Sequence, residues 1–328
     1  MTELHGKRIL LTGATSGVGL AAVERFAQEG ADLALVARGE AALEQAAAIA
    51  RDEGVAAHVI PADLADRAQA EAAVATAVQA LGGLDVVVSN AGAVAFGHFL
   101  EVEADDFDRT VAITFTGAVN LLRAALPELR KTSGVVVATS SIMAGIPLPT
   151  FSSYSAAKHA LRGFLSTLQI EEREQRTGVQ VAMVSPGPVN TPIYGRATSG
   201  TGRAPATLPD SYDAQEVADA LVAAAIAPRH ERIVGGESHL VHNLYRHARP
   251  AAELLLVFVD RWFRTGTEPA SVPGGLWEPM AEARVSDGIP ARASGDVLSL
   301  ARHVGGAAAR AVRTAPELLR PVPERPAA

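Results

Sequence analysis

The chain has 328 residues, of which 48% are hydrophobic and 20% are charged, and its formal charge at pH 7 is −7. Such a composition supports a globular core, and the acidic balance argues against a nucleic-acid binder, which would usually carry a basic patch. The chain has no cysteine, which excludes disulfides, thiolate metal sites, iron–sulfur clusters and cysteine nucleophiles.

Short aliphatic runs alternate with longer alanine-rich segments along most of the chain. The runs predict buried strands at 7–11, 32–37, 58–60, 86–89, 135–139, 179–184 and 233–234. The segments between them predict helices near 17–29, 40–53, 66–81, 105–130, 153–176 and 214–227. This alternation predicts an α/β protein with a doubly wound Rossmann-type fold, in which a seven-stranded, mostly parallel sheet has helices on both faces.

The alternation stops after residue 237, so we divide the chain into a main domain, 1–237, and a C-terminal extension, 238–328. Residues 195–210 are rich in Gly, Ser, Thr, Ala and Pro and predict a mobile loop. The extension is expected to be helical and partly irregular, with one or two amphipathic helices in 238–264, irregular chain in 265–295 and a last helix at 294–313.

A glycine-rich turn follows the first predicted strand, where residues 12–19 read TGATSGVG. Glycines at a strand-to-helix turn let the backbone approach a pyrophosphate, whose charge is stabilised by N–H groups at the start of the helix. The alternative is a tight turn in which glycine serves packing alone. The position after the first strand favours a nucleotide site, with contacts from Gly13, Thr15, Ser16, Gly17, Val18 and Gly19.

The second predicted strand ends in Ala37 and Arg38. An NAD site would place an acidic side chain here to hold the ribose 2′-hydroxyl, whereas an arginine can bind a 2′-phosphate with two hydrogen bonds. The alternative is a solvated loop arginine. We therefore expect NADP(H) to be preferred, with NAD possible. After the third and fourth strands, further nucleotide contacts are expected from Asp63 (to the adenine amino group), Leu64, Asn90, Ala91 and Gly92.

Tyr154 and Lys158 lie four residues apart in a predicted helix, so they face the same side. A phenol titrates near pH 10, and a nearby cation favours the phenolate. The pair predicts that Tyr154 acts as a general acid/base, the alternative being a surface pair on a helix. Ser141, just after the fifth strand, can hold a substrate oxygen, although composition does not separate it from the serines nearby.

The order and spacing of these motifs resemble those of the short-chain dehydrogenase/reductases, in their single-domain, non-extended type, over about residues 5–236. The resemblance rests on TGATSGVG at 12–19, NAG at 90–92, Ser141, Tyr154 with Lys158, and Pro186-Gly187. It implies that hydride passes between a nicotinamide ring and a substrate carbon while Tyr154 exchanges the proton and Ser141 fixes the substrate oxygen.

The resemblance also implies roles for neighbouring residues. Lys158 would lower the pKa of Tyr154 and bind the nicotinamide ribose. The nicotinamide and the phosphates would be held by Pro186, Gly187, Val189 and Thr191, and residues 193–210 would form a variable substrate lid.

One position departs from the family. An asparagine usually stands in the helix after the fourth strand and holds a proton-relaying water, and here Thr114 aligns with it. Asn120 cannot replace that asparagine, because six residues turn a helix by about 240° around its axis. A threonine can still hydrogen-bond a water or a carbonyl, so we count Thr114 as catalytic and expect an altered proton relay.

Together the residues predict an NADP(H)-preferring oxidoreductase that interconverts a carbonyl and an alcohol. The alternative is a non-catalytic NADP(H)-binding sensor or scaffold protein, for which Thr114 is the main support. No metal is expected, because Glu237, His239, His242 and His247 fit a solvated helix face better than a metal site.

The sequence also bears on partners and location. The apolar segment 251–263 predicts a packed helix and hints at a lipophilic small-molecule substrate, with attachment to a membrane surface as the weaker alternative.

Helices 105–130 and 153–176 are where many family members associate, so we expect a homodimer or homotetramer. The N-terminus lacks a signal-peptide pattern, and the longest strongly apolar run, Leu254–Val259, is far shorter than the about 20 residues that cross a bilayer. We therefore expect a cytoplasmic protein.

Overall fold

The fold is that of a computed structural model, in which residues 2–208, 211–266, 268–270 and 274–286 are described. Seven parallel strands form the central sheet in the order β3-β2-β1-β4-β6-β7-β9. They are β1 (Arg8–Thr12), β2 (Asp32–Ala37), β3 (Ala57–Pro61), β4 (Val86–Ser89), β6 (Val135–Thr139), β7 (Gln180–Pro186) and β9 (Glu231–Val234). The predicted seven-stranded sheet is confirmed. Its order reverses direction between β1 and β4, where open α/β sheets bind ligands.

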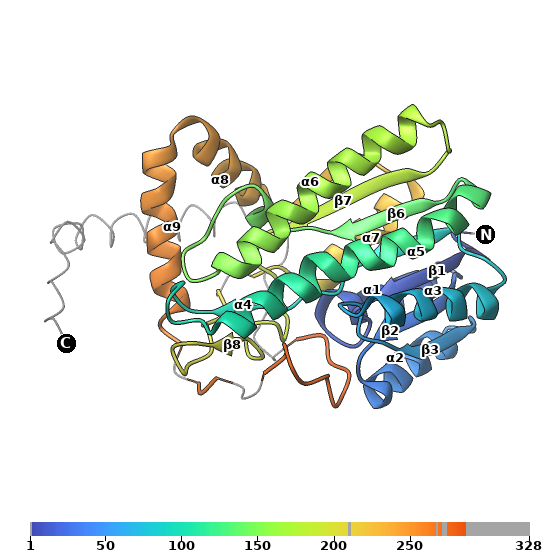
Figure 1. Cartoon of the computed structure of the whole chain (residues 1–328), viewed down its shortest axis with the longest axis horizontal. Coiled ribbons are helices and arrows are strands. Elements are labelled where there is room, and N and C mark those ends of the chain that lie inside the picture. Colours follow the sequence, from blue (N-terminus) through green and yellow to red (C-terminus); the bar gives the residue numbers. More distant parts are fainter. Residues whose placement is uncertain (1, 209–210, 267, 271–273, 287–328) are drawn as a thin grey trace, which may run out of the picture. The chain divides into compact units, whose positions relative to one another are not determined.

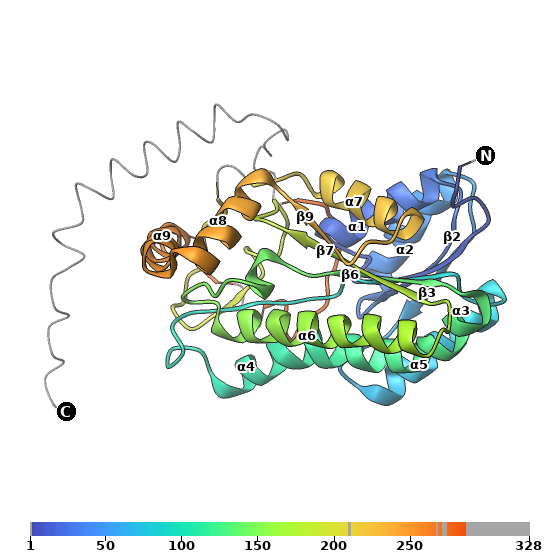
Figure 2. The same ribbon diagram turned by 90° about the horizontal axis from the view of Figure 1, so that it is seen from above.

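Helices cover both faces of the sheet (Figures 1 and 2). One face packs against α1 (Gly17–Gln28), α2 (Glu40–Asp52) and α7 (Ala214–Ile226). The other packs against α3 (Arg67–Leu81), α5 (Gly117–Thr132) and α6 (Ser152–Glu174). The strands are apolar on both faces because both are buried, which is why they lack the alternating pattern of a solvated sheet.

The predicted helix 105–130 consists of three consecutive pieces. These are α4 (Ala104–Val111), a π-helical turn at Ala112–Thr116, and α5. The whole stretch, Ala104–Thr132, is long and apolar enough to span a membrane by length and composition. In the structure its apolar residues Leu121, Leu122 and Leu129 are fully buried against the sheet, so they serve as a core face.

Two short strands were not predicted. β5 (Ala95–Phe96) and β8 (Thr198–Ser199) pair in parallel as a separate two-stranded sheet. β8 lies inside the segment predicted as a loop, and two residues are too few to show a strand periodicity. This pairing holds the segment after β7 against the segment after β4.

The chain after β9 forms two helices, α8 (Gly236–His247) and α9 (Arg249–Phe263), at one end of the sheet (Figures 1 and 2). The amphipathic helices predicted in 238–264 are thus confirmed. Pro250 lies in the first turn of α9, where its missing N–H prevents one continuous helix, and the break falls at Ala248.

Within 274–286, the structure contains no helix or strand, as predicted for the irregular region. The helix predicted at 294–313 lies outside the described residues. The domain boundary after residue 237 stays a prediction, and α8 and α9 belong to the same compact unit as the sheet, Met1–Arg292.

Candidate active site

A cavity of about 430 Å³ runs along the carboxyl ends of β1, β2, β4, β6 and β7. All of the predicted catalytic and cofactor-binding residues line it except Gly19 and Thr114. The structure therefore brings together side chains from the glycine turn, the strand ends and α6, as the sequence predicted. The cavity is continuous from Arg38 at one end to Tyr154 and beyond at the other.

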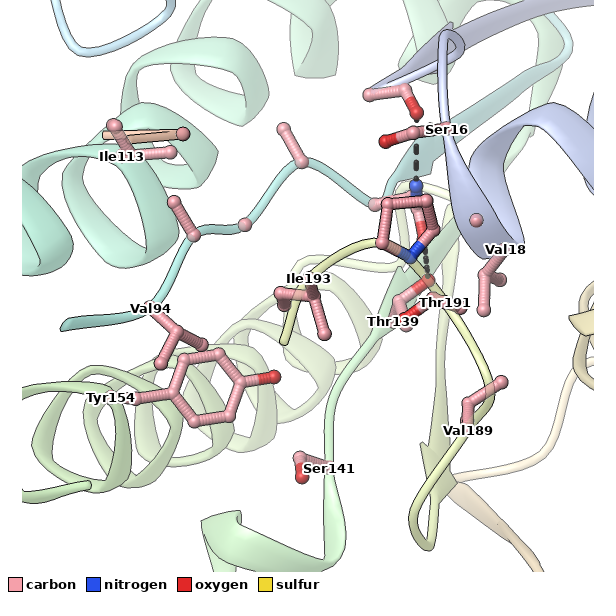
Figure 3. Close-up of a pocket in the computed structure, with 18 of the residues that line it drawn as sticks. Ser16, Val18, Val94, Ile113, Thr139, Ser141, Tyr154, Val189, Thr191 and Ile193 are labelled. Carbon is pink, nitrogen blue, oxygen red and sulfur yellow. Dashed lines mark hydrogen bonds between the residues drawn. The ribbon is translucent and has the colours of Figure 1, made fainter. Parts of the chain in front are cut away.

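Tyr154, Ser141 and Lys158 all line this cavity. Figure 3 shows Tyr154 and Ser141. Tyr154 projects from α6 with its hydroxyl directed into the cavity, and Ser141 lies beside it at the end of β6. The Ser141 and Tyr154 side chains face the same part of the cavity. Ser141 also caps the short 3₁₀ helix Ile142–Ala144 by accepting from Met143 N at 3.1 Å, which fixes its position. The arrangement can hold an oxygen atom between two hydroxyl groups.

Burial sets the protonation of the pair on α6. Burial raises the pKa of Tyr154 to about 12, although a hydrogen bond from Ser141 acts to lower that pKa. Burial also lowers the pKa of Lys158 to about 8. The predicted net lowering of the tyrosine pKa is therefore not found, because burial outweighs the contributions that lower it. Lys158 Nζ lies 5.5 Å from the centre of the Tyr154 ring and donates to Thr139 O at 2.7 Å, so desolvation outweighs the attraction of the ammonium for a phenolate.

Thr114 does not face the cavity. Its hydroxyl is fully buried, accepts from Ala93 N and donates to Ala93 O, both at 3.2 Å. Thr114 thus fixes the backbone just after the Asn90–Gly92 turn. Asn120 points elsewhere, as predicted, and donates to Leu64 O at 3.0 Å.

The glycine turn is shaped by close backbone packing. Gly13 has a φ of +69°, and a Cβ there would lie 3.0 Å from Ala91 Cα. A Cβ on Gly19 would lie 2.0 Å from Gly13 O, so this glycine serves packing within the turn. Asn90 also acts structurally, since its side chain donates to Thr12 O and accepts from the Thr139 hydroxyl, tying the ends of β1, β4 and β6 together.

These features fit a dinucleotide. The turn presents backbone without side chains at Gly13 and Gly17, and the first turn of α1 lies at the cavity. Of its N–H groups, that of Gly17 donates to Arg284 O at 3.0 Å, and those of Gly19 and Leu20 donate to Ser16 O. The cavity continues from this turn to the Tyr154 hydroxyl, where a nicotinamide ring would meet the substrate.

Known proteins share both the sequence pattern and the fold. A family model for the short chain dehydrogenases matches residues 7–201. The chain belongs to the short-chain dehydrogenase/reductase family. An uncharacterized oxidoreductase of Staphylococcus epidermidis is 30% identical over 234 residues, which cover 71% of this chain and 96% of that protein.

Two further proteins with described activities are similar. The 11-beta-hydroxysteroid dehydrogenase 1A of Arabidopsis thaliana is 38% identical over 205 residues, which cover 61% of this chain and 57% of that protein. The structure of an alcohol dehydrogenase from the archaeon Thermococcus sibiricus, complexed with 5-hydroxy-NADP, matches with a TM-score of 0.63 and 27% identity, over 70% of this chain and 95% of that one. The chain is accordingly an NAD(P)-dependent oxidoreductase.

The substrate end of this short-chain dehydrogenase/reductase site has an apolar wall. Beyond Tyr154, the cavity is lined by side chains that pack as one buried cluster, among them Val94, Ile146, Leu148, Phe151, Leu256 and Phe263. α9 supplies Leu256, Val259 and Phe263, so part of the wall comes from beyond the region of family resemblance.

Sequence reasoning missed two polar side chains at this end. Tyr194 lines the cavity; burial raises the pKa of its phenol, and the charge of Tyr154 nearby raises it further. Ser238 on α8 also lines the cavity and is 1% exposed, and within the described ranges its Oγ has no hydrogen-bond partner. Tyr194 falls in the predicted lid, but nothing in its local pattern distinguishes it, and Ser238 lies after the recognised motifs.

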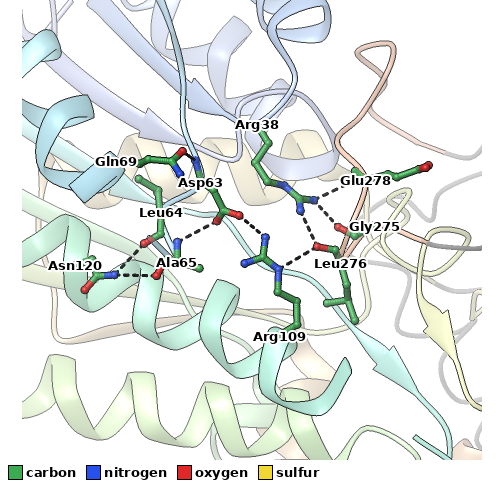
Figure 4. A network of polar contacts seen from close by, with 10 residues as sticks. All are labelled: Arg38, Asp63, Leu64, Ala65, Gln69, Arg109, Asn120, Gly275, Leu276 and Glu278. Atoms are coloured by element: carbon green, nitrogen blue, oxygen red, sulfur yellow. Dashed lines mark hydrogen bonds and ion pairs between the residues drawn. The ribbon is translucent and has the colours of Figure 1, made fainter. Parts of the chain in front are cut away.

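At the end of the cavity lined by Arg38 and Asp63, here called the adenosine end, the hydrogen-bond partners differ from the prediction (Figure 4). The Arg38 guanidinium donates to Leu276 O at 2.6 Å, Gly275 O at 2.5 Å and Glu278 O at 3.1 Å. Asp63 pairs with Arg109 and accepts from Ala65 N. Each residue lines the cavity but bonds to protein groups where the sequence predicted nucleotide groups. The partners of Arg38 lie far along the chain, in a segment without periodicity, and Arg109 lies in α4.

Proposed function

We propose that this short-chain dehydrogenase/reductase interconverts a carbonyl and an alcohol, with Tyr154 as the general acid/base and NADP(H) as the preferred cofactor. The observation that carries the proposal is that Tyr154, Ser141 and Lys158 line the same cavity as the glycine turn, with Lys158 Nζ 5.5 Å from the centre of the Tyr154 ring. A surface Tyr–Lys pair would have no such cavity.

In the reductive direction, the bound cofactor would supply a hydride from nicotinamide C4 to the carbonyl carbon. Ser141 donates a hydrogen bond to the carbonyl oxygen and holds it beside Tyr154. The Tyr154 hydroxyl gives its proton to that oxygen, which leaves an alcohol and a tyrosinate. Lys158, with a pKa of about 8, is largely protonated at pH 7 and stabilises the tyrosinate by its charge.

The role of Thr114 changes from the sequence expectation. Its hydroxyl is engaged with both backbone groups of Ala93, so we propose that it positions the Asn90–Gly92 turn and does not relay protons. A Cβ on Gly92 would lie 3.8 Å from Thr114 Oγ1 and 4.0 Å from Lys158 Nζ, so the turn lies between the two side chains.

The preference for NADP(H) is supported by the charges at the adenosine end. Burial lowers the pKa of Arg38; the charge of Asp63 raises it, and those of Arg109 and Arg196 lower it. The positive charges of Arg109 and Arg196 near Arg38 outnumber the single negative charge of Asp63. This excess of positive charge favours the binding of an anion such as a 2′-phosphate. Among the described residues, Arg38 uses three of its five N–H donors on carbonyls, which leaves two for a phosphate.

We propose a lipophilic substrate that carries a second oxygen atom. The apolar wall fits a hydrocarbon body, and the similarity to a hydroxysteroid dehydrogenase supports that class. Ser238 lines the cavity, and its buried hydroxyl has no partner in the part of the chain that the structure describes; an unsatisfied buried hydroxyl is costly. A substrate hydroxyl or carbonyl would satisfy it.

The test is NADPH oxidation with a panel of ketones and aldehydes of increasing apolar size, with and without a second oxygen. We expect turnover to rise with apolar size and to be highest for compounds with that oxygen. Cofactor binding without turnover of any compound would contradict the proposal and would favour a non-catalytic sensor or scaffold protein.

We further propose that the protein is a homo-oligomer formed through α5 and α6, which lie side by side on one face of the molecule (Figure 2). Ile170 on α6 is 65% exposed, which suits a subunit contact. Light scattering should give a mass above that of a monomer, and Ile170→Asp should lower it; a monomeric wild-type protein would contradict this.

A further inference from the structure

The segment 274–286, here named the clasp, lies across the adenosine end of the cavity. Its first part is held by arginines from three parts of the chain, of which Figure 4 shows Arg38 and Arg109. Besides the bonds from Arg38, Arg109 Nε donates to Leu276 O at 3.3 Å, and Arg196 Nη2 donates to Glu278 O at 2.9 Å. In return, Gly275 N donates to Arg196 O at 2.8 Å.

Side chains of the clasp are also docked. Leu276 is fully buried and packs with Ala93, Ala95 and Ile113, next to the turn after β4. Trp277 Nε1 donates to Asp106 Oδ1 at 2.6 Å, and its ring lies under the Arg109 guanidinium at 5.6 Å. A buried leucine and a bonded tryptophan fix the clasp in one register.

The second part of the clasp reaches the glycine turn. Gly17 N donates to Arg284 O at 3.0 Å, and Arg284 N donates to Thr15 O at 3.3 Å. Ala283 N donates to the Gln45 side chain on α2 at 2.8 Å. The clasp therefore spans from the turn after β4 to the turn after β1.

The clasp encloses the adenosine end without filling it. Gly275, Glu278, Pro279 and Met280 line the same continuous cavity as the glycine turn and Asp63. A segment that occupied the nucleotide site as a competitor would divide this cavity, whereas here it forms one of its walls.

We propose that the clasp is the outer wall of the adenosine subsite and that it must undock before the cofactor can enter or leave. This inference rests on the cofactor binding in the proposed function. The clasp then controls the rates of cofactor exchange, and Arg38 couples it to the cofactor by bonding to both.

The absence of cysteine allows a direct test. A Cβ on Gly39 would lie 3.2 Å from Pro279 Cβ, near the about 3.5–4.5 Å between the Cβ atoms of a disulfide, so the double variant Gly39→Cys/Pro279→Cys can lock the clasp. The same Cβ would lie 2.5 Å from Met280 O, so the backbone at Met280 must shift, and the Gly39→Cys single variant measures the effect of that shift alone. NADPH fluorescence in stopped flow measures entry and release, with the single variants and the reduced double variant as controls.

We expect the oxidised double variant to take up NADPH at least about tenfold more slowly than its reduced form, and to retain NADPH loaded before oxidation through gel filtration. Equal exchange rates in the two redox forms would overturn the proposal. Expulsion of pre-loaded NADPH on oxidation would also overturn it, because a competitor and not a wall would then occupy the site.

A second variant covers the case in which the disulfide does not form. Leu276→Asp places a charge in the buried contact and should speed NADPH release about tenfold, as interface changes act mainly on dissociation. Leu240→Asp, at a leucine that is 60% exposed on α8, is the control. Slower or unchanged release in Leu276→Asp would contradict the proposal. If the wild-type protein binds neither NADPH nor NADH, the proposed function fails before the clasp is tested.

Discussion

The two ends of the cavity are built from different parts of the chain. At the nicotinamide end, Ser141, Tyr154 and Lys158 come from one strand end and the helix that follows it. At the adenosine end, the backbone of the clasp is bonded by Arg38, Arg109 and Arg196, which lie far apart in sequence. The comparison shows that Ser141, Tyr154 and Lys158 come from neighbouring parts of the sequence, whereas the wall of the adenosine end depends on contacts between residues far apart in sequence.

The largest effect is expected at the locally encoded end. Tyr154→Phe removes the proposed proton donor and should lower kcat about 10³-fold, while NADPH affinity changes little, because a positioned general acid contributes about 10²–10⁴-fold. Steady-state kinetics and NADPH titration measure the two quantities. Tyr194→Phe is the matched control, since it removes a second phenol from the same cavity; an equal loss there would break the assignment of the acid to Tyr154.

The next effect compares cofactors at the other end. Arg38→Ala should weaken NADPH binding about 30-fold, because a charge-assisted hydrogen bond is worth about 1.5–3 kcal/mol, and NADH binding by less. The loss for NADH measures the contribution of Arg38 to holding the clasp, and the additional loss for NADPH measures its contact with the 2′-phosphate. Equal losses would mean that Arg38 only holds the clasp.

The buried Lys158 should make the free energy of unfolding depend on pH. Its folded-state pKa of about 8 lies below the ordinary lysine pKa of 10.5, so the unfolded chain binds more protons between these values and the contribution of Lys158 to stability rises with pH. From pH 8 to 9.5 the gain should be about 1.5 kcal/mol. The raised pKa of Tyr154, about 12, makes stability fall as pH rises, but only above pH 10, where an unfolded tyrosine ionises. Urea unfolding of wild type and Lys158→Met isolates the difference, and identical pH slopes would rule out the buried charge.

The smallest effect concerns the substrate. Ser238→Ala should raise KM about fivefold for substrates with the second oxygen and leave kcat unchanged, because one neutral hydrogen bond is worth about 1 kcal/mol. Analogues without that oxygen are the control and should show no change. A similar rise in KM for both kinds of compound would remove Ser238 from the recognition of the substrate.

Sequence reasoning reached the sheet, its helices and the reacting groups because each depends on local patterns. The strand runs, the glycine turn and the Tyr154–Lys158 spacing can all be interpreted within a few residues of chain. It did not reach the partners of Arg38 and Asp63, since Leu276 and Arg109 meet them only after folding. Nor did it give the pKa of Tyr154, which depends on how deeply the site is buried.

Helix α9 has a consequence for how new specificities can arise. Leu256, Val259 and Phe263 on its inner side touch the cavity, while Leu254 and Trp262 on its outer side are 56% and 40% exposed. The helix follows the last strand and contributes no reacting group. Substitutions along its inner side can therefore enlarge or reshape the space beyond Tyr154 while Tyr154 and the glycine turn keep their positions, which makes α9 a natural target for directed evolution.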